Sequence, residues 1–496
     1  MTPPLLLVPL DARPCTSRFP RDIAAIAGLT VLAPNPALLG DLRRPADTAA
    51  LHDWLQDHAP RASALVIALD TLAYGGLIPS RREDIPLETL VERLSLLKHL
   101  KLAHPNLPLY AFSVTMRLSD SNDATEEKSY WDRFGKLLFR HSFHLDRYQQ
   151  LHDPQDLETA SEAEALIPPE ILADYLATRE RNFLVNRMLI DWTRDGILDL
   201  LLLTQDDTSR FGFNVREQRQ LLADIQAKGL QDRVLIYPGA DEVASVLVAR
   251  HLNQSQGRKP AFHLVTSTPD GADITAMYED RPLSRTVAGQ VAAVGGRLVD
   301  NPADADIALM LNTPSTGQGD LALRIGLDRP DTPPRDLAPF VRALESSSRP
   351  VALADVAYAN GADPELFRAF QNYPDLAAFA GWNTAGNTIG TVVAQASAYL
   401  HQRSRGTPFP SDPDVLAQQG FLRDRMADDL LYQSFLRPLL QQELAAGAPL
   451  DALEADLGRR LETLWRRHFP QIAIAGISAS LPWNRLFEAD ITVQAR

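Results

Sequence analysis

The chain has 496 residues, of which 45% are hydrophobic and 23% are charged. A chain of this length and composition can bury a sizeable core, and it is too apolar to be disordered. With 49 Lys and Arg against 63 Asp and Glu, the formal net charge is −14. This charge disfavours a large phosphate-binding surface, so we expect neither nucleic acid nor an anionic membrane as a partner.

The cysteine content and the first residues bear on the compartment. The single cysteine, Cys15, excludes an intrachain disulfide and a site built from several thiolates. Residues 1–10 lack a basic segment and hold only a short apolar run, which predicts a strand rather than a signal peptide. Because no stretch reaches about 18 apolar residues, we expect a soluble, cytoplasmic protein.

Eight short apolar runs recur along the chain, and helical stretches separate most of them. Each run is nearly continuous rather than alternating, which is typical of parallel strands buried on both faces. The alternation of strands and helices predicts an α/β protein. The runs are Leu5–Leu10, Leu65–Leu69, Leu109–Val114, Leu198–Thr204, Val234–Tyr237, Ile307–Leu311, Val351–Ala354 and Ala377–Ala380.

Eight principal strands predict a (β/α)8, TIM-like barrel. Three further strand-like runs, Thr30–Ala33, Phe262–Thr266 and Gly296–Val299, do not fit a minimal barrel. The alternative is a pair of doubly wound α/β domains. In the barrel interpretation the parts are a catalytic barrel over 1–405 with a helical crossover at 121–197 and a small α/β insert at 260–305, a linker at 406–413, and a helical C-terminal extension over 414–496 with a late strand in 487–493.

Polar and aromatic side chains collect after the predicted strands. The carboxyl ends of strands build the sites of barrels and of open α/β sheets, so we expect these side chains to converge. Turn and cap geometry alone would explain single Asp or Asn residues, but not Arg or Trp. The candidate substrate-binding residues are Asp11, Arg13, Asp70, Tyr74, Arg117, Tyr237, Asp241, Glu242, Asn312, Asp355, Tyr358, Asn360, Trp382, Asn383 and Asn387.

The sharpest local feature is the pair Asp206-Asp207, which follows the fourth predicted strand. Two neighbouring carboxylates raise each other's proton affinity, which would divide them into an acid/base and a charge stabiliser. Adjacent residues on a strand point to opposite faces, so both can reach one site only where the strand breaks. In the alternative interpretation, Asp207 or Thr208 is a helix cap. A second pair, Asp428-Asp429, lies within a helical pattern and is predicted to be a solvated helix face.

Motifs for common cofactors are missing. The sequence has no Walker loop, no GxGxxG, no GxSxG and no HExxH. His141 and His144 are three residues apart on a predicted helix, and such pairs are more often packing residues than metal ligands. We therefore predict no cofactor and no metal.

Three segments carry a resemblance across nearly the whole chain. PLDARP at 9–14, YPGADE at 237–242 and WNTAGNTIG at 382–390 resemble an uncharacterised bacterial family that opens with a PLD-x-RP motif. That resemblance implies no particular activity.

The second half of the predicted strand series resembles the O-GlcNAcase-type β-N-acetylhexosaminidases. The shared order is a double Asp after the fourth strand, Tyr-Pro after the fifth, an Asn-containing loop after the seventh and Trp-Asn after the eighth. The resemblance implies a (β/α)8 glycoside hydrolase with substrate-assisted catalysis. In it, Asp206 would orient and polarise the 2-acetamido group, Asp207 would be the general acid/base, and Trp382 and Asn383 would line the sugar pocket.

Three functions remain as hypotheses. The first is a glycoside hydrolase, exo-acting on N-acetylhexosaminides, with a small-molecule or oligosaccharide substrate. The second is a hydrolase or lyase that depends on Mg²⁺ or Mn²⁺ held by carboxylates, namely those of Asp11, Asp70, Asp207 and Glu242. The third is a non-enzymatic sugar-binding protein that uses Tyr74 and Trp382 as stacking platforms.

Overall fold

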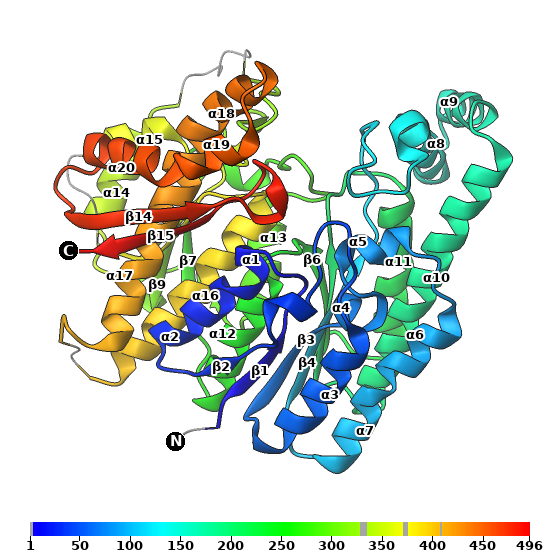
Figure 1. Ribbon diagram of the computed structural model, residues 1–496, viewed down its shortest axis with the longest axis horizontal. Coiled ribbons are helices and arrows are strands. Elements are labelled where there is room, and N and C mark those ends of the chain that lie inside the picture. The colour runs from blue at the N-terminus through cyan, green and yellow to red at the C-terminus, as the bar shows by residue number, and fades with distance from the viewer. Residues whose placement is uncertain (1–2, 328–334, 371–374, 407–408) are drawn as a thin grey trace. The chain divides into compact units, whose positions relative to one another are not determined.

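The computed structural model describes residues 3–327, 335–370, 375–406 and 409–496. It is an α/β structure with two parallel sheets, one of six and one of five strands, and the chain divides into two compact units (Figure 1). The first unit comprises Met1–Ala12, Val31–Ala244 and Tyr278–Asp280. The second comprises Arg13–Thr30, Ser245–Met277 and Arg281–Arg496.

The six-stranded sheet belongs to the first unit, and all of its pairings are parallel. The chain starts inside the sheet, adds one strand on one side and then continues on the other side, which is the doubly wound order with a switch point between β1 and β3. In sheet order the strands are β2 (Val31–Leu32), β1 (Leu5–Val8), β3 (Ala64–Ala68), β4 (Leu109–Thr115), β5 (Leu200–Gln205) and β6 (Val234–Pro238).

Helices pack against one face of this sheet. Alternate strand residues such as Leu65, Ile67 and Leu203 form one core with helix residues such as Leu94 and Leu189. Side chains in a strand alternate between faces, so every second strand residue enters this core. The helices of the first unit are α3 (Thr48–His58), α4 (Leu69–Tyr74), α5 (Leu77–Arg82), α6 (Leu87–Leu94), α7 (Leu96–Ala103), α8 (Trp131–Leu151), α9 (Pro154–Ala165), α10 (Pro169–Arg194) and α11 (Phe213–Ala227).

The five-stranded sheet of the second unit repeats the same order. Its first strand in the sequence, β7, lies between β8 and β9, and the later strands follow on the side of β9. The segment expected as an insert at 260–305 supplies β7 and β8, so it begins this sheet instead of being an addition to another one. In sheet order the strands are β13 (Leu376–Ala380), β11 (Val351–Asp355), β9 (Ile307–Asn312), β7 (Ala261–Thr266) and β8 (Arg297–Leu298).

The second unit also contains most of the C-terminal helices and a hairpin of β14 (Ile474–Ser480) and β15 (Asp490–Ala495). Met310 and Phe379 of the sheet share a core with Leu430 and Trp465. Its remaining elements are α1 (Pro14–Ser17), α2 (Phe19–Ile26), α12 (Val243–Ser255, whose first two residues belong to the first unit), α13 (Leu283–Ala293), β10 (Gly319–Asp320), α14 (Ala338–Glu345), β12 (Tyr358–Ala359), α15 (Pro364–Ala369), α16 (Ala385–Ser404), α17 (Pro413–Arg425), the π-helix (Met426–Leu436), α18 (Arg437–Ala445), α19 (Leu450–Ala455) and α20 (Leu457–His468).

The α/β class is confirmed, and all eleven apolar runs contain strands. No barrel is detected in the strand pairing of the described residues. The pairing instead fits the alternative of two doubly wound parts. The sequence does not distinguish the two folds, because a barrel and a doubly wound sheet have the same alternation of strands and helices and differ only in which strands pair. Residues 407–408 of the expected linker lie outside the described residues.

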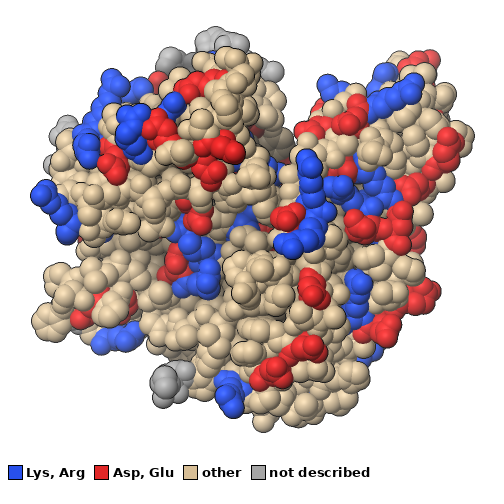
Figure 2. All heavy atoms as spheres, in the orientation of Figure 1, with Lys and Arg blue, Asp and Glu red and all other residues tan. Residues whose placement is uncertain are grey.

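Two properties of the surface bear on the expected partners. Among the described residues, no helix combines the length and the apolar character needed to cross a membrane. Acidic and basic side chains are interspersed on the face that Figure 2 shows.

Candidate functional site

The residues predicted at strand ends fall into two groups, one in each unit. The first unit holds Asp11, Asp70, Tyr74, Arg117, Asp206, Asp207, Tyr237, Asp241 and Glu242. The second holds Arg13, Asn312, Asp355, Tyr358, Asn360, Trp382, Asn383 and Asn387.

The double Asp lies at a break in the backbone. Strand β5 ends at Gln205, and the chain bends at the next two residues. Asp206 and Asp207 therefore escape the alternation that would send them to opposite faces of the sheet. Each reaches a different arginine: Asp206 Oδ2 accepts from Arg81 Nη1 at 3.0 Å, and Asp207 Oδ2 accepts from Arg117 Nη1 at 3.2 Å.

Two glutamates join the two arginines. Glu126 Oε2 lies 2.9 Å from Arg81 Nη2 and 3.1 Å from Arg117 Nη2. Glu127 Oε1 lies 3.3 Å from Arg81 Nε and 2.8 Å from Arg117 Nε. We call the six residues the carboxylate–arginine cluster: Arg81, Arg117, Glu126, Glu127, Asp206 and Asp207.

The cluster holds four carboxyl groups against two guanidinium groups, which makes full ionisation unfavourable. Burial, followed by the neighbouring charge of Asp206, raises the pKa of Asp207 to about 7, although Arg117 opposes this shift. Burial works against the charge of Arg117, but Glu126 and Glu127 keep its pKa well above the ordinary value. Water still reaches the acid, because 33% of the Asp207 side chain is exposed.

Asp70 and Tyr74 lie close to the cluster on the helix that follows β3. Asp70 is buried in α4, and its Oδ2 accepts the backbone N–H of Val114 at 2.9 Å. Burial raises the pKa of Asp70 to about 7, and the charges of Arg81 and Asp206 also act on it. Tyr74 is buried under the guanidinium of Arg181, 5.2 Å from the ring centre, and burial raises its pKa.

A second buried ion pair contacts the backbone on which the Arg117 of the cluster lies. Arg179 donates to both carboxylate oxygens of Glu217 at 2.7 Å. Its remaining hydrogens go to the backbone oxygens of Met116 and Arg117, at 3.0 and 3.1 Å, and to the hydroxyl of Tyr175 at 3.1 Å. Arg179 therefore holds the loop that carries Arg117 in place.

The other candidates of the first unit are buried residues that lie after β1 or in and after β6. Asp11 follows β1, and Asp241 and Glu242 follow β6. Tyr237 lies inside β6, and its hydroxyl has no hydrogen-bond partner among the described residues. Burial, followed by the charge of Glu242, raises its pKa.

In the second unit, a fully enclosed network follows β9 and β11. Asn312 Nδ2 donates to Asp355 Oδ1 at 2.9 Å and to Asp363 Oδ2 at 3.3 Å. Arg335 Nη1 lies 3.0 Å from Asp363 Oδ2. Burial and the charge of Asp363 raise the pKa of Asp355 to about 7. Because Asn312, Asp355 and Asp363 are each 0% exposed, this network stabilises the loops and is closed to a solute.

The polar residues after β12 and β13 also form hydrogen bonds with backbone and side-chain groups. Asn360 donates to Asp320 Oδ2 at 2.8 Å, and its backbone N–H donates to the carbonyl of Asn383 at 2.7 Å. Asn387 Nδ2 donates to Asn383 Oδ1. Trp382 is buried, and its Nε1 has no partner among the described residues.

Two further candidates of the second unit contact cations or rings. Arg13 lies just before α1, with its guanidinium 5.0 Å from the ring centre of Trp483. Tyr358 lies in β12, 5.7 Å below the guanidinium of Arg335.

The prediction that Asp428 and Asp429 form a solvated helix face is wrong. Both are buried in the π-helix, where Arg425 lies 3.1 Å from Asp428 Oδ2 and 2.8 Å from Asp429 Oδ1. Asp429 Oδ2 also accepts the N–H of Gly381 at 2.7 Å. The helix packs on the sheet of the second unit, and a sequence pattern with two charged residues gives no sign of that burial.

The predicted histidine pair joins two helices. His141 Nδ1 lies 3.1 Å from the carbonyl oxygen of Ala160, and His144 Nδ1 lies 2.7 Å from Asp156 Oδ1, both partners being in α9. Within the described ranges, no group of three or more His, Cys, Asp or Glu side chains is arranged to hold a metal ion.

Among these groups, the carboxylate–arginine cluster combines an acid of raised pKa, Asp207, with access to water. Three of its members, Arg81, Glu126 and Glu127, are not among the predicted site residues. Arg81 lies in the last turn of α5, and the two glutamates lie within a loop. None of the three residues therefore follows a strand directly. No motif in the sequence marks these three residues as members of a site.

The chain matches the model of a protein family of unknown function, DUF4127, over residues 5–492. It therefore belongs to that family, which agrees with the resemblance of PLDARP and the two later motifs to a single family. No curated protein and no solved structure matches the chain, and no glycosidase homologue is found.

Proposed function

We propose that the protein is a glycoside hydrolase in which Asp207 is the general acid/base. The observation that carries this proposal is the Asp207 carboxyl, which is partly exposed at the carboxyl end of β5 and has its pKa raised to about 7. An acid whose pKa lies near the working pH transfers protons most effectively in both directions. Most glycosidases use a pair of carboxyl groups, one of which is an acid with a raised pKa, and the second carboxyl group here is that of Asp206.

The hydrogen bonds favour different roles for the two carboxyl groups. Arg117 binds Asp207 through Oδ2, and among the described residues Oδ1 has no hydrogen-bond partner, so Oδ1 can carry the transferable proton. Arg81 binds Asp206 in the same way and leaves its Oδ1 for the substrate. The two arginines also fix the separation of the two acids, which precise proton transfer requires.

For an N-acetylhexosaminide, the proposed reaction has two steps. The Asp207 carboxyl donates its proton to the departing glycosidic oxygen while the substrate's acetamido oxygen attacks the anomeric carbon. Asp206 accepts a hydrogen bond from the acetamido N–H and so stabilises the cyclic intermediate. Asp207, now ionised, then takes a proton from the water that opens this intermediate. The expected contribution of Trp382 and Asn383 to the sugar pocket stays a prediction, since both lie in the second unit.

The test uses the full chain and two kinds of substrate: 4-nitrophenyl N-acetyl-β-glucosaminide and the same sugar on an alkyl alcohol. Asp207→Asn should lose about 10²–10⁴-fold in kcat/KM on the alkyl glycoside. It should lose far less on the nitrophenyl glycoside, whose leaving group needs little protonation. Asp206→Asn should slow both substrates to a similar extent. Asp195→Asn, an exposed residue after α10, is the matched control and should behave like the parent protein.

Each contrary result favours another function. Equal losses on both substrates for Asp207→Asn would contradict its role as acid. Activity that a chelator removes and Mg²⁺ or Mn²⁺ restores would favour the metal-dependent hydrolase. Sugar binding without any turnover would favour the sugar-binding protein.

A further inference from the structure

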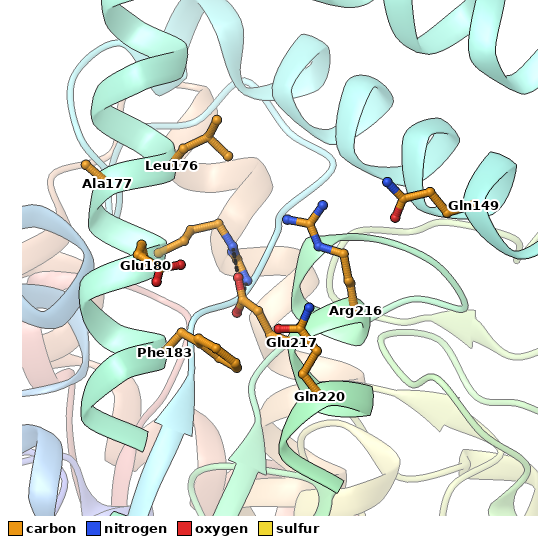
Figure 3. A pocket seen from close by; sticks show the side chains of 9 residues that line it. Gln149, Leu176, Ala177, Glu180, Phe183, Arg216, Glu217 and Gln220 are labelled. Atoms are coloured by element: carbon orange, nitrogen blue, oxygen red, sulfur yellow. Dashed lines mark hydrogen bonds and ion pairs between the residues drawn. The ribbon is translucent and has the colours of Figure 1, made fainter. Parts of the chain in front are cut away.

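A pocket of about 630 Å³ lies in the first unit between α8, α10 and α11. Figure 3 shows Leu176 and Phe183 of α10 on one side, Gln149 of α8 on the other, and Arg216 of α11 between them. A volume of this size suits a small organic molecule. The floor is the Arg179–Glu217 ion pair, whose charges are already matched by two hydrogen bonds of 2.7 Å.

Arg216 is the cation in this pocket that has no matched acid. Its guanidinium stacks 4.4 Å from the ring centre of Phe213, and it has neither a hydrogen bond nor an ion pair among the described residues. The ring holds the guanidinium in place from one side, which leaves its N–H groups for a ligand. A planar guanidinium prefers the two oxygens of a carboxylate or a phosphate.

The rest of the lining selects among anions. The lining contains two arginines, Arg179 and Arg216, and two glutamates, Glu180 and Glu217. Its formal charge is therefore zero, so a doubly charged anion gains little. Leu176 and Phe183 offer apolar surface, while the Gln149 amide offers a further donor beside Arg216. A monocarboxylate with an apolar body fits all three features.

We propose that this pocket is a binding site for small apolar monocarboxylic acids, with Arg216 as the carboxylate receptor. The site is separate from the carboxylate–arginine cluster, and the proposal does not depend on the proposed glycosidase activity. Arg179 links the two places, because it forms the pocket floor and also donates to the backbone of Arg117.

Calorimetric titration of the full chain with 3-phenylpropanoate tests the proposal. We expect saturable binding of one molecule, and at least tenfold weaker binding of the neutral 3-phenylpropanamide and of inorganic phosphate. Arg216→Gln should weaken 3-phenylpropanoate binding at least tenfold, and Phe183→Ala should weaken it as well. The control Arg194→Gln removes an exposed arginine at the far end of α10 and should leave binding unchanged.

Melting temperatures of the variants show whether each one is folded. Arg216 forms no ion pair with the described residues, so we expect Arg216→Gln to fold. No binding of 3-phenylpropanoate, binding that survives Arg216→Gln in a folded variant, or equal affinity for the neutral amide would each overturn the proposal. Phosphate that binds as tightly as the carboxylate would show a simple anion site and would also overturn it.

Discussion

Asp70 and Asp207 have the same raised pKa of about 7 but differ in surroundings. Asp70 is 1% exposed, and its Oδ2 accepts a hydrogen bond from the backbone N–H of Val114. Asp207 is partly exposed and paired with Arg117. A raised pKa in an enclosed group affects mainly stability, whereas in an accessible group it also suits proton transfer.

For Asp70, we expect stability to fall as pH rises. The pKa of Asp70 is higher in the folded than in the unfolded chain, so between about pH 4 and 7 the folded state binds the proton more tightly. The stabilisation that this proton gives to the folded state is lost as the pH rises toward 7. Asp70→Asn removes the ionisable group and keeps an acceptor for the N–H of Val114. Its unfolding free energy relative to the parent should therefore rise by about 1 kcal/mol per pH unit between about pH 5 and 7. Urea unfolding at several pH values measures this difference, and a pH-independent difference would contradict it.

For Asp207, the prediction concerns the rate. If the protonated acid is required, kcat/KM on an alkyl glycoside should fall above about pH 7, as the carboxyl with a pKa of about 7 loses its proton. The pH profile of Asp207→Asn should lack this fall. A parent profile that stays flat from pH 6 to 9 would exclude Asp207 as the acid.

At the scale of elements, the π-helix depends on one arginine. Arg425 is buried and lies within 3.1 Å of both Asp428 and Asp429, which follow it by three and four residues along the same helical run. Burial raises the pKa of Asp429 to about 7 even with this arginine present. Without it, two buried carboxylates would share one helix with no cation between them.

Arg425→Met should therefore destabilise the protein strongly. Removing one partner of a buried ion pair costs about 3–5 kcal/mol. The loss should be larger at pH 8 than at pH 5, because the two acids can take up protons at the lower pH and become neutral. Arg423→Met, a partly exposed neighbour on α17, is the control and should change stability little. Thermal unfolding at both pH values makes the comparison, and equal losses at both would contradict the electrostatic explanation.

At the scale of the whole molecule, the formal net charge is −14, and on the face that Figure 2 shows acidic and basic groups are interspersed. The cations that line the candidate site and the pocket are mostly paired with acids, as Arg81, Arg117 and Arg179 show. Nucleic acid binds to surfaces where unpaired cations can replace condensed counterions.

We therefore predict no measurable binding of a fluorescently labelled 20-base-pair DNA duplex at 0.15 M salt, as followed by anisotropy at micromolar protein. Saturable binding that weakens steeply with added salt would contradict this prediction and would indicate a basic surface that the net charge conceals.

The sequence by itself determined where the strands are and which strand end carries paired acids. Both are local properties: a continuous apolar run marks a buried strand, and Asp206-Asp207 stands directly after such a run. It also placed the polar candidates at the carboxyl ends of strands in both units, because these residues follow the strands in the chain.

Only the tertiary structure decided how the strands pair and which groups the acids meet. One strand–helix rhythm is compatible with a barrel and with two doubly wound sheets, and the choice depends on hydrogen bonds between strands distant in sequence. Arg81 meets Asp206 across 125 positions of the chain, and Asp428 and Asp429 are buried because the whole π-helix packs on a sheet. Burial and charge pairing act through space, so no local pattern carries them.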